Sequence, residues 1–250
     1  MSKKLNMQIK KYLKELKLSY LKSEFQELSK QASQESLSYE EYLLEILKLE
    51  YENRNQKKIE KFLKESKIPL EKNISSFDLK RISKKAIYQF KVLLNGDFLD
   101  RKENLLIFGN PGSGKTHLIC ALSQELISKG KRIYFTKCDF LVQDLLIAKR
   151  ELKISKMIKK FSKFDAIIID DIGYVNQSKR EMEVLFSLLA ERYEKGSIFI
   201  TSNLSFSKWG KIFKDQTMAT AAIDRLIHHS IIFELNIKSY RMEKARKKIA

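Results

Sequence analysis

One octapeptide constrains the fold of this chain more than any other feature, and it reads Gly109-Asn110-Pro111-Gly112-Ser113-Gly114-Lys115-Thr116. It matches G-x-x-x-x-G-K-[ST] at every fixed position, follows a short apolar run and precedes an amphipathic stretch. A strand must therefore pass through a glycine-rich loop into a helix. Such a unit belongs to an α/β fold, and the sequence predicts one here.

The same loop carries the chemistry of a phosphate-binding site. Gly112 and Gly114 would let backbone amides and the helix N-terminus face phosphate groups. Lys115 would reach the β- and γ-phosphate oxygens of ATP, and the Thr116 hydroxyl would ligate Mg²⁺. We therefore predict ATP and Mg²⁺ as cofactors. The expected ATP-binding residues are Gly109, Asn110, Pro111, Gly112, Ser113, Gly114, Lys115, Thr116 and His117.

A pair of acidic residues forms the second motif. The run Ala166–Ile169 has the length of a buried strand and is followed directly by Asp170 and Asp171. Asp170 would hold Mg²⁺, usually through water, and Asp171 would polarise the attacking water. The alternative is a strand that ends in two solvated acids. With the phosphate-binding loop upstream, we interpret the pair as the Walker B element of an ATPase.

From Asn104 onward, short apolar runs alternate with longer amphipathic ones. This alternation is typical of βαβ units, so we predict a three-layer α/β core around a five-stranded parallel sheet. The expected strands are Leu105–Phe108, Arg132–Phe135, Ala166–Ile169, Ile198–Thr201 and Ile231–Leu235. The expected helices are Lys115–Lys129, Phe140–Phe161, Ser178–Lys195 and Thr220–His228. Functional groups should gather at the carboxyl ends of the strands.

The first part of the chain is predicted to be helical. Up to about Lys91, glycine and proline are nearly absent and apolar residues recur at helical spacing. The segment Ser38-Tyr39-Glu40-Glu41 has the form of a capping box and predicts a helix that starts at Tyr39, whereas Pro69 marks a turn. We expect a helical N-terminal domain for partner or DNA interaction over 1–72, a helical linker over 73–103, an ATPase core over 104–237 and a basic tail over 238–250.

The order of these motifs resembles the DnaA/DnaC branch of the AAA+ ATPases, and more closely the IstB-like transposition helper ATPases. The resemblance covers nearly the whole chain. Its most diagnostic parts are Gly114-Lys115-Thr116-His117-Leu118, Asp170-Asp171-Ile172-Gly173, Trp209 ahead of Asp215, and Ile223-Asp224-Arg225-Leu226-Ile227-His228-His229. Leu37-Ser38-Tyr39-Glu40-Glu41 and Glu52-Asn53-Arg54 also resemble that family's helical domain, which a bare ATPase core would not require.

The resemblance implies roles for three further residues. Asn203 would be a sensor that bonds the lytic water or the γ-phosphate; the alternative is a turn-forming asparagine. Arg225 would be a finger supplied to a neighbouring subunit's ATP; the alternative is an ion pair with Asp224 or another acid. Arg241 lies where DnaC-type relatives carry a sensor II arginine. The expected catalytic group is Lys115, Asp171, Asn203 and Arg225.

A formal net charge of +18 indicates a polyanionic partner, DNA or RNA first; the alternative is a lysine-rich composition whose lysines only solvate helices. The basic segment ahead of the acidic pair contributes Lys149, Arg150, Lys153, Lys156, Lys159 and Lys160. On one continuous helix, several of these cations would share a face and follow a phosphate backbone. The alternative is a solvated amphipathic helix. Since no base-reading motif is recognisable, we expect duplex DNA binding that is weakly sequence-selective and strongly salt-dependent.

The resemblance also implies the biology. Such proteins assemble on duplex DNA with ATP as homo-oligomers, share nucleotide sites between subunits, and assist a partner transposase in target choice and integration. Because many relatives have glutamate where Asp171 stands, we expect slow turnover that DNA or a partner stimulates. The alternatives are a DnaC-like loader of a replicative helicase and a nucleotide-gated DNA-binding module with negligible hydrolysis. A small-molecule kinase fits less well, because Asn203 and Arg225 suit hydrolysis better.

The remaining features exclude some classes of protein. Cys120 and Cys138 lie far apart and belong to no metal-ligand cluster, so we expect free core thiols. No apolar run approaches the roughly 20 residues that span a bilayer, and the lysines near the N-terminus do not suit a signal peptide. We expect a bacterial cytoplasmic protein that associates with the nucleoid when bound to DNA.

Overall fold

The computed structural model describes residues 3–173, 178–204, 209, 224, 226–240 and 242–243. The chain divides into two compact units, residues 1–61 and 62–250. The N-terminal unit contains α1 (Lys3–Glu15), α2 (Ser19–Gln34) and most of α3 (Tyr39–Ser66). The units thus divide within α3, whereas the boundary expected at residue 72 follows the turn at Pro69. Within the described part of the chain, no helix is long and apolar enough to cross a membrane.

Side-chain caps determine where two helices of the N-terminal unit begin. The amide of Glu41 donates to Ser38 Oγ at 3.2 Å and the Ser38 amide donates to the Glu41 carboxylate at 2.8 Å, which confirms the predicted capping box. In contrast, α2 has no side-chain cap of its own at Leu18. Glu50 of α3 takes that role, because its carboxylate accepts from the amides of Tyr20 and Leu21, both at 3.1 Å.

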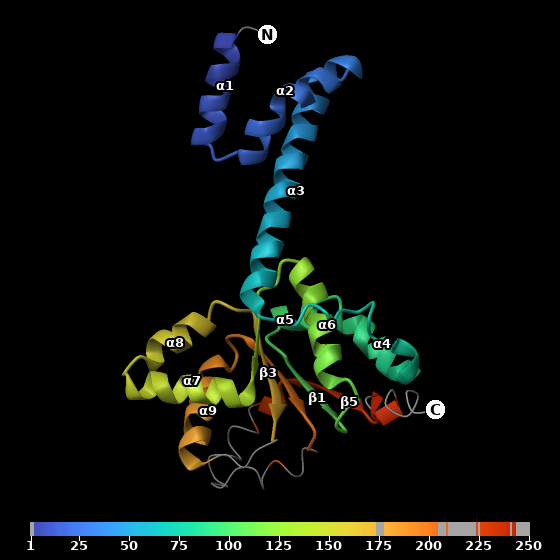
Figure 1. The fold of residues 1–250 in the computed structure, drawn as a ribbon, viewed down its shortest axis with the longest axis vertical. Helices are drawn as coiled ribbons and strands as arrows, with labels where there is room; N and C mark the ends of the chain where they lie inside the picture. Colours follow the sequence, from blue (N-terminus) through green and yellow to red (C-terminus); the bar gives the residue numbers. More distant parts are fainter. Residues whose placement is uncertain are drawn as a thin grey trace. The chain divides into compact units, whose positions relative to one another are not determined.

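A parallel five-stranded sheet forms the centre of the second unit (Figure 1). Its strands are β1 (Asn104–Gly109), β2 (Ile133–Lys137), β3 (Ala166–Ile172), β4 (Ser197–Ser202) and β5 (Ser230–Leu235). The order β2-β3-β4-β1-β5 places β4, late in the chain, between β3 and β1. All pairings among the described strands are parallel, and the predicted fold class is confirmed.

Helices cover both faces of the sheet, so the three central strands β3, β4 and β1 are buried on both sides, whereas the edge strand β5 is partly exposed. The helices that follow the strands are α6 (Lys115–Ser128), α7 (Cys138–Arg150), α8 (Ile154–Phe161) and α9 (Lys179–Arg192). Alternate residues such as Leu106 and Phe108 belong to a core cluster with α7, α8 and α9, which Figure 1 shows grouped together. The strand residues that alternate with this cluster face the other side of the sheet. There Phe199 of β4 stacks on Phe98, with ring centroids 5.7 Å apart.

Three short helices connect α3 to the sheet: η1 (Leu79–Arg81), α4 (Lys84–Leu93) and α5 (Asp97–Asp100). Asp78 caps η1 through the amide of Lys80 at 3.1 Å, and Ser83 caps α4 through the amide of Ala86 at 3.2 Å. The linker is therefore helical in part, and the segment before η1 lies against the N-terminal end of α6.

The helix expected over Phe140–Phe161 is wrong, because the structure has α7 and α8 with a break between them. Leu152 takes the left-handed conformation at φ 56°, and the Lys153 amide donates to Ala148 O at 2.7 Å. This is the pattern of a helix C-terminus closed by a left-handed residue. The break lets α8 turn Phe161 into the core while its lysines face solvent.

Two other expectations differ in extent. The strand expected to stop at Ile169 continues to Ile172, with a register shift against β4 between those residues. The helix expected over Thr220–His228 lies mostly outside the described residues. Its described part is helical at Asp224 and from Leu226 to His228.

Candidate nucleotide-binding site

The phosphate-binding loop and the ends of β3 and β4 meet at the carboxyl edge of the sheet. A pocket of about 330 Å³ lies there. The loop from Pro111 to His117 lines it, together with Asp171 and Asn203. The expectation that functional groups gather at this edge is thus met by residues from three separate parts of the sequence.

The loop needs glycine at the two positions where its backbone turns most sharply. Gly112 and Gly114 have φ values of 78° and 97°, in the left-handed region that side chains disfavour. A Cβ on Gly112 would also collide with Ser239, and one on Gly114 would lie 3.0 Å from the Phe77 ring. Gly114 begins α6 without any side-chain cap, so the first amides of this helix are available to a phosphate.

Lys115 is held within the loop rather than extended into solvent. Its Nζ donates to Gly109 O at 2.9 Å and to Asn110 O at 3.1 Å, and only 6% of the residue is exposed. The ammonium is therefore positioned at the centre of the turn that would surround phosphate groups. Gly109 and Asn110 contribute through their carbonyls and do not line the pocket.

Asp170 joins the loop to the neighbouring strand. Thr116 Oγ1 donates to Asp170 Oδ1 at 2.9 Å, and Thr201 Oγ1 donates to the same oxygen at 2.6 Å. Burial raises the pKa of the Asp170 carboxyl, although the hydrogen bond from Thr201 opposes this. A hydroxyl and a carboxylate side by side are hard oxygen ligands of the kind Mg²⁺ takes in phosphate-loop proteins. These residues fit a magnesium ion.

Asp171 differs from its neighbour in backbone and surroundings. Its φ of 62° is uncommon for a residue with a side chain, and its amide donates to Thr201 Oγ1 at 2.9 Å. Both Asp171 and Asn203 line the pocket, whereas Asp170 is buried beneath it at 2% exposure. The two acids of the motif thus have different positions relative to the pocket.

Thr201 is a site residue that sequence reasoning missed. Its hydroxyl donates to Asp170 and accepts from the Asp171 amide, so one fully buried side chain positions both acids. The sequence contains a signal for it, because Thr201 is a polar residue at the end of the apolar run of β4, two residues before Asn203. Its partners become evident only from the pairing of β3 with β4.

His117, expected among the ATP-binding residues, faces the linker as well as the pocket. Its Nε2 lies 3.0 Å from Asn73 O and 3.1 Å from Ser76 Oγ. The Phe77 ring meets the imidazole edge to face, with centroids 5.2 Å apart. The linker therefore forms one wall of the pocket, and no local pattern in the sequence indicates this contact.

A short segment after β5 forms another wall. The Tyr240 amide donates to Gly112 O in the loop at 3.0 Å. Arg81 of η1 binds this segment through Lys238 O and the Glu243 carboxylate, both at 2.9 Å, and its guanidinium lies 5.0 Å from the centre of the Tyr240 ring. Arg225 and Arg241, the predicted finger and sensor II residues, lie outside the described residues.

The basic residues predicted to bind DNA are only partly brought together. Lys153, Lys156, Lys159 and Lys160 line a hollow of about 610 Å³ between α7 and α8, which Lys163 joins. Lys149 instead lies 3.5 Å from the Glu183 carboxylate of α9, and neither it nor Arg150 lines the hollow. The single face expected on a continuous helix is wrong, because the chain turns at Leu152.

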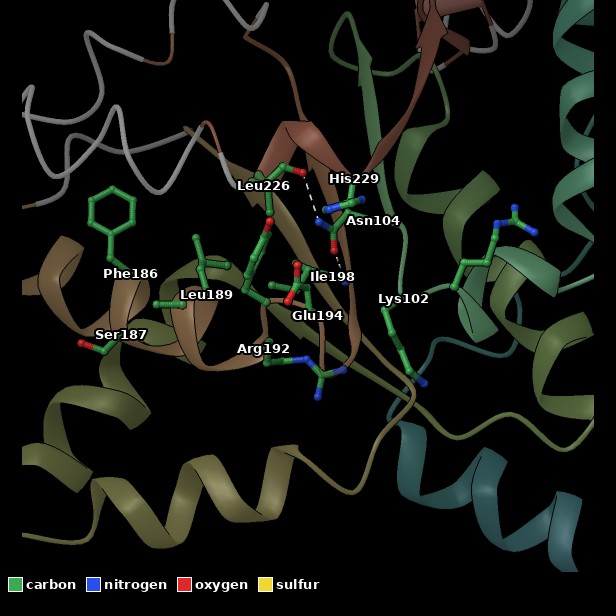
Figure 2. A pocket seen from close by; sticks show the side chains of 13 residues that line it. Lys102, Asn104, Phe186, Ser187, Leu189, Arg192, Glu194, Ile198, Leu226 and His229 are labelled. Carbon is green, nitrogen blue, oxygen red and sulfur yellow. Dashed lines mark hydrogen bonds between the residues drawn. The ribbon is translucent and has the colours of Figure 1, made fainter.

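A second cavity, of about 380 Å³, lies beside the amino ends of β1 and β4 (Figure 2). The Asn104 side chain bonds Leu226 O at 3.1 Å and the Ile198 amide at 2.8 Å. Burial lowers the pKa of Arg192 to about 10. Its guanidinium donates to the carbonyls of Phe161, Phe164, Asp165 and Ser197. These groups serve the fold, and the phosphate-binding loop lies at the other edge of the sheet.

The sheet order, the loop with its buried lysine and the threonine–aspartate pair define a P-loop protein of the AAA+ type. Comparison with known proteins identifies the family within this class of protein. The chain belongs to the IstB-like ATP-binding protein family, whose sequence pattern matches residues 11–248. It is 39% identical over 93% of its length to an insertion-sequence ATP-binding protein of Sinorhizobium fredii, covering 78% of that protein. A similar protein from Geobacillus stearothermophilus is 38% identical, with 95% of each chain covered.

Solved structures support the fold assignment. The DnaC helicase loader superposes with a TM-score of 0.56 at 23% identity, over 68% of this chain and 98% of that one. DnaA from Aquifex aeolicus, solved with AMPPCP bound, has a TM-score of 0.56 at 18% identity, over 73% of this chain and 56% of that one. At these identities the likeness concerns the fold alone.

Proposed function

We propose that this protein is a Mg²⁺-dependent ATPase that assembles on duplex DNA and helps a transposase to select and join its target. The observation that carries the enzymatic part is the cluster of Thr116, Asp170 and Thr201 beneath a pocket lined by Asp171. A protein that only bound nucleotide would not need a second carboxylate held separately at the phosphate end.

Each residue of the site has a chemical task in this proposal. The loop amides and Lys115 bind the phosphates of ATP, while Thr116 and Asp170 hold Mg²⁺. The bound ion would neutralise charge between the β- and γ-phosphates. Asp171 accepts a proton from the attacking water, and Asn203 orients that water toward the γ-phosphate. The hydrogen bond from Thr201 keeps Asp170 aligned with Thr116.

The DNA-binding part rests on charge. In the hollow between α7 and α8, Lys156, Lys159, Lys160 and Lys163 provide neighbouring cations without a base-reading element, whereas Lys153 is paired with Glu151 at 2.7 Å. Such a surface suits phosphate contacts that are indifferent to sequence. Assembly into oligomers that share nucleotide sites, with Arg225 as the shared residue, belongs to the same proposal.

A transposase is the preferred partner for a specific reason. The insertion-sequence relative from Geobacillus matches 95% of this chain, N-terminal unit included. The structural match to the helicase loader covers 68% of it. A DnaC-like loading role is the second candidate, and capture of a replicative helicase rather than a transposase by the full chain would favour it.

ATP turnover with and without duplex DNA tests the proposed function. We expect slow hydrolysis that DNA accelerates. Asp171→Asn should bind ATP but hydrolyse it about 100-fold more slowly, because it lacks the proton acceptor. Asp139→Asn makes the same chemical change at an exposed residue outside the pocket and should turn over like the wild type. Absence of turnover in the wild type under both conditions would remove the enzyme assignment.

A further inference from the structure

The nucleotide pocket contains a lysine that belongs to none of the motifs. Lys72 lines it together with Thr116 and Asp171, although it precedes the ATPase core in the sequence. It ends a turn that begins at Pro69, where the Lys72 amide donates to Pro69 O at 3.2 Å. The turn comes soon after the end of α3, so this lysine belongs to the first residues of the second unit.

The backbone on both sides of the Lys72 side chain is tied to α6, the helix that begins at the phosphate-binding loop. Gln124 Nε2 donates to Lys72 O at 3.1 Å and to Pro69 O at 3.2 Å. The next carbonyl, Asn73 O, lies 3.0 Å from His117 Nε2. These bonds fix the backbone of Lys72 relative to Lys115 and Thr116. The anchored backbone therefore holds the Lys72 side chain in the pocket.

Lys72 shares the pocket with Thr116 and Asp171. Burial raises the pKa of Cys120, one helical turn beyond Thr116, to about 12, and the nearby Lys72 ammonium opposes this rise. Among the described residues Lys72 forms no ion pair with an acid. A half-buried ammonium without a carboxylate partner is a candidate for binding an anion.

We propose that Lys72 is a second phosphate-binding lysine, which contacts the β- and γ-phosphates of ATP in addition to Lys115 of the loop. The inference deepens the proposed ATP-binding function and rests on it. An ammonium has only donors and interacts with phosphate as a point charge, so the phosphate end is its natural partner rather than the base. The triphosphate would then join the turn after α3 to the loop, through contacts with both Lys72 and Lys115.

Binding of ATP, ADP and AMP to the full chain tests this proposal. In Lys72→Gln we expect ATP affinity to fall about 10-fold or more, the reduction expected when a charge-assisted hydrogen bond is removed. ADP affinity should fall less and AMP affinity should stay within about twofold, because AMP lacks the β- and γ-phosphates. Lys72→Arg keeps the charge and should retain most of the ATP affinity. Lys80→Gln removes the same charge from an exposed linker residue outside the pocket and should bind all three like the wild type.

The ratio of ATP to AMP affinity is measured within one preparation, so it is independent of the fraction of folded protein. Wild-type affinity for ATP in Lys72→Gln, or an equal reduction for ATP and AMP, would overturn the role of Lys72. If the wild type and Lys80→Gln themselves fail to bind ATP, the proposed function fails instead. The two failures are therefore distinguishable.

Discussion

At the scale of single residues, the site depends on a hydroxyl that performs no chemistry. Thr201 Oγ1 donates to Asp170 Oδ1 and accepts from the Asp171 amide, and the residue is fully buried. It therefore fixes the carboxylate expected to hold Mg²⁺ and the backbone of the residue expected to activate water. Thr201 is a positioning residue, because it touches neither the nucleotide pocket nor a reacting atom.

Replacing Thr201 by valine tests this positioning role. The side chain keeps its shape, but the Asp171 amide loses its acceptor and Asp170 loses a donor. We expect the free energy of unfolding to fall by about 1–3 kcal/mol, the cost of leaving buried polar groups unpaired. The measurement is urea unfolding of the nucleotide-free protein.

The control for this prediction is Thr201→Ser, which keeps the hydroxyl. It should retain the nucleotide chemistry and lose only the packing of one methyl group. A valine variant with wild-type stability and wild-type Mg²⁺ dependence of ATP binding would show that the hydroxyl has no positioning role.

At the scale of elements, contacts between helices replace missing local signals. The start of α3 is encoded by neighbours in the sequence, since Ser38 and Glu41 cap each other. The start of α2 is encoded by a distant residue, because Glu50 accepts from two amides at its first turn. Arg54 completes the contact by donating to Glu50 at 2.8 Å and to Lys17 O at 2.7 Å.

The Glu50 contact predicts a pH-dependent stability of the N-terminal unit. Although burial works to raise the pKa of Glu50, its hydrogen bonds and Arg54 lower it below 4.5 overall. The stability that Glu50 contributes is therefore fully present above its unfolded pKa and is lost as the pH falls through the lower folded value. Near pH 7, Glu50→Gln should reduce hydrogen-exchange protection of α2 about tenfold or more, because the amides of α2 no longer donate to a charged group.

Glu52→Gln is the matched control, since Glu52 is an exposed residue of the same helix. It should leave the protection of α2 unchanged. Equal protection of α2 in the two variants near pH 7 would contradict the assignment of Glu50 as the cap of α2.

At the scale of the whole molecule, the cations behind the net charge of +18 differ in their surroundings: some pair with acids and others are exposed to solvent. Some cations bond within the protein, as Lys149 does with Glu183 and Arg132 does with Glu65 at 2.7 Å. The lysines of α8 remain on its solvent face and line the hollow beside α7. Long-range attraction comes from the total charge, whereas direct binding of phosphates requires exposed cations that are close together.

This difference predicts the salt dependence of DNA binding. Replacing Lys156, Lys159 and Lys160 by alanine should reduce the slope of log affinity against log salt by roughly 0.9 for each DNA phosphate that is no longer neutralised. Replacing Lys84, Lys85 and Lys91 of α4 removes the same charge from another exposed surface and should alter the slope less. The measurement is duplex affinity over a salt series. Equal slopes for both triple variants would place the DNA elsewhere.

The sequence by itself determined the features that depend on near neighbours in the chain. The phosphate-binding loop, the run into Asp170 and Asp171, the parallel α/β class and the start of α3 all follow from motifs or periodicity within a few residues. The prediction of one continuous helix over Phe140–Phe161 was wrong because it used near neighbours alone. The packing of Phe161 into the core depends on residues distant in the sequence, which helical periodicity does not report.

Tertiary structure alone decided which distant segments complete the site. Thr201 reaches both acids only because β4 inserts beside β3. Lys72 and Tyr240 reach the pocket only because the turn after α3 and the chain after β5 pack against the loop and α6. Such contacts depend on strand order and on backbone anchoring across the fold. Local sequence patterns carry no information about strand order or about backbone anchoring between distant segments. The motifs therefore identified the nucleotide chemistry, whereas the fold was needed to find the other residues that line the pocket.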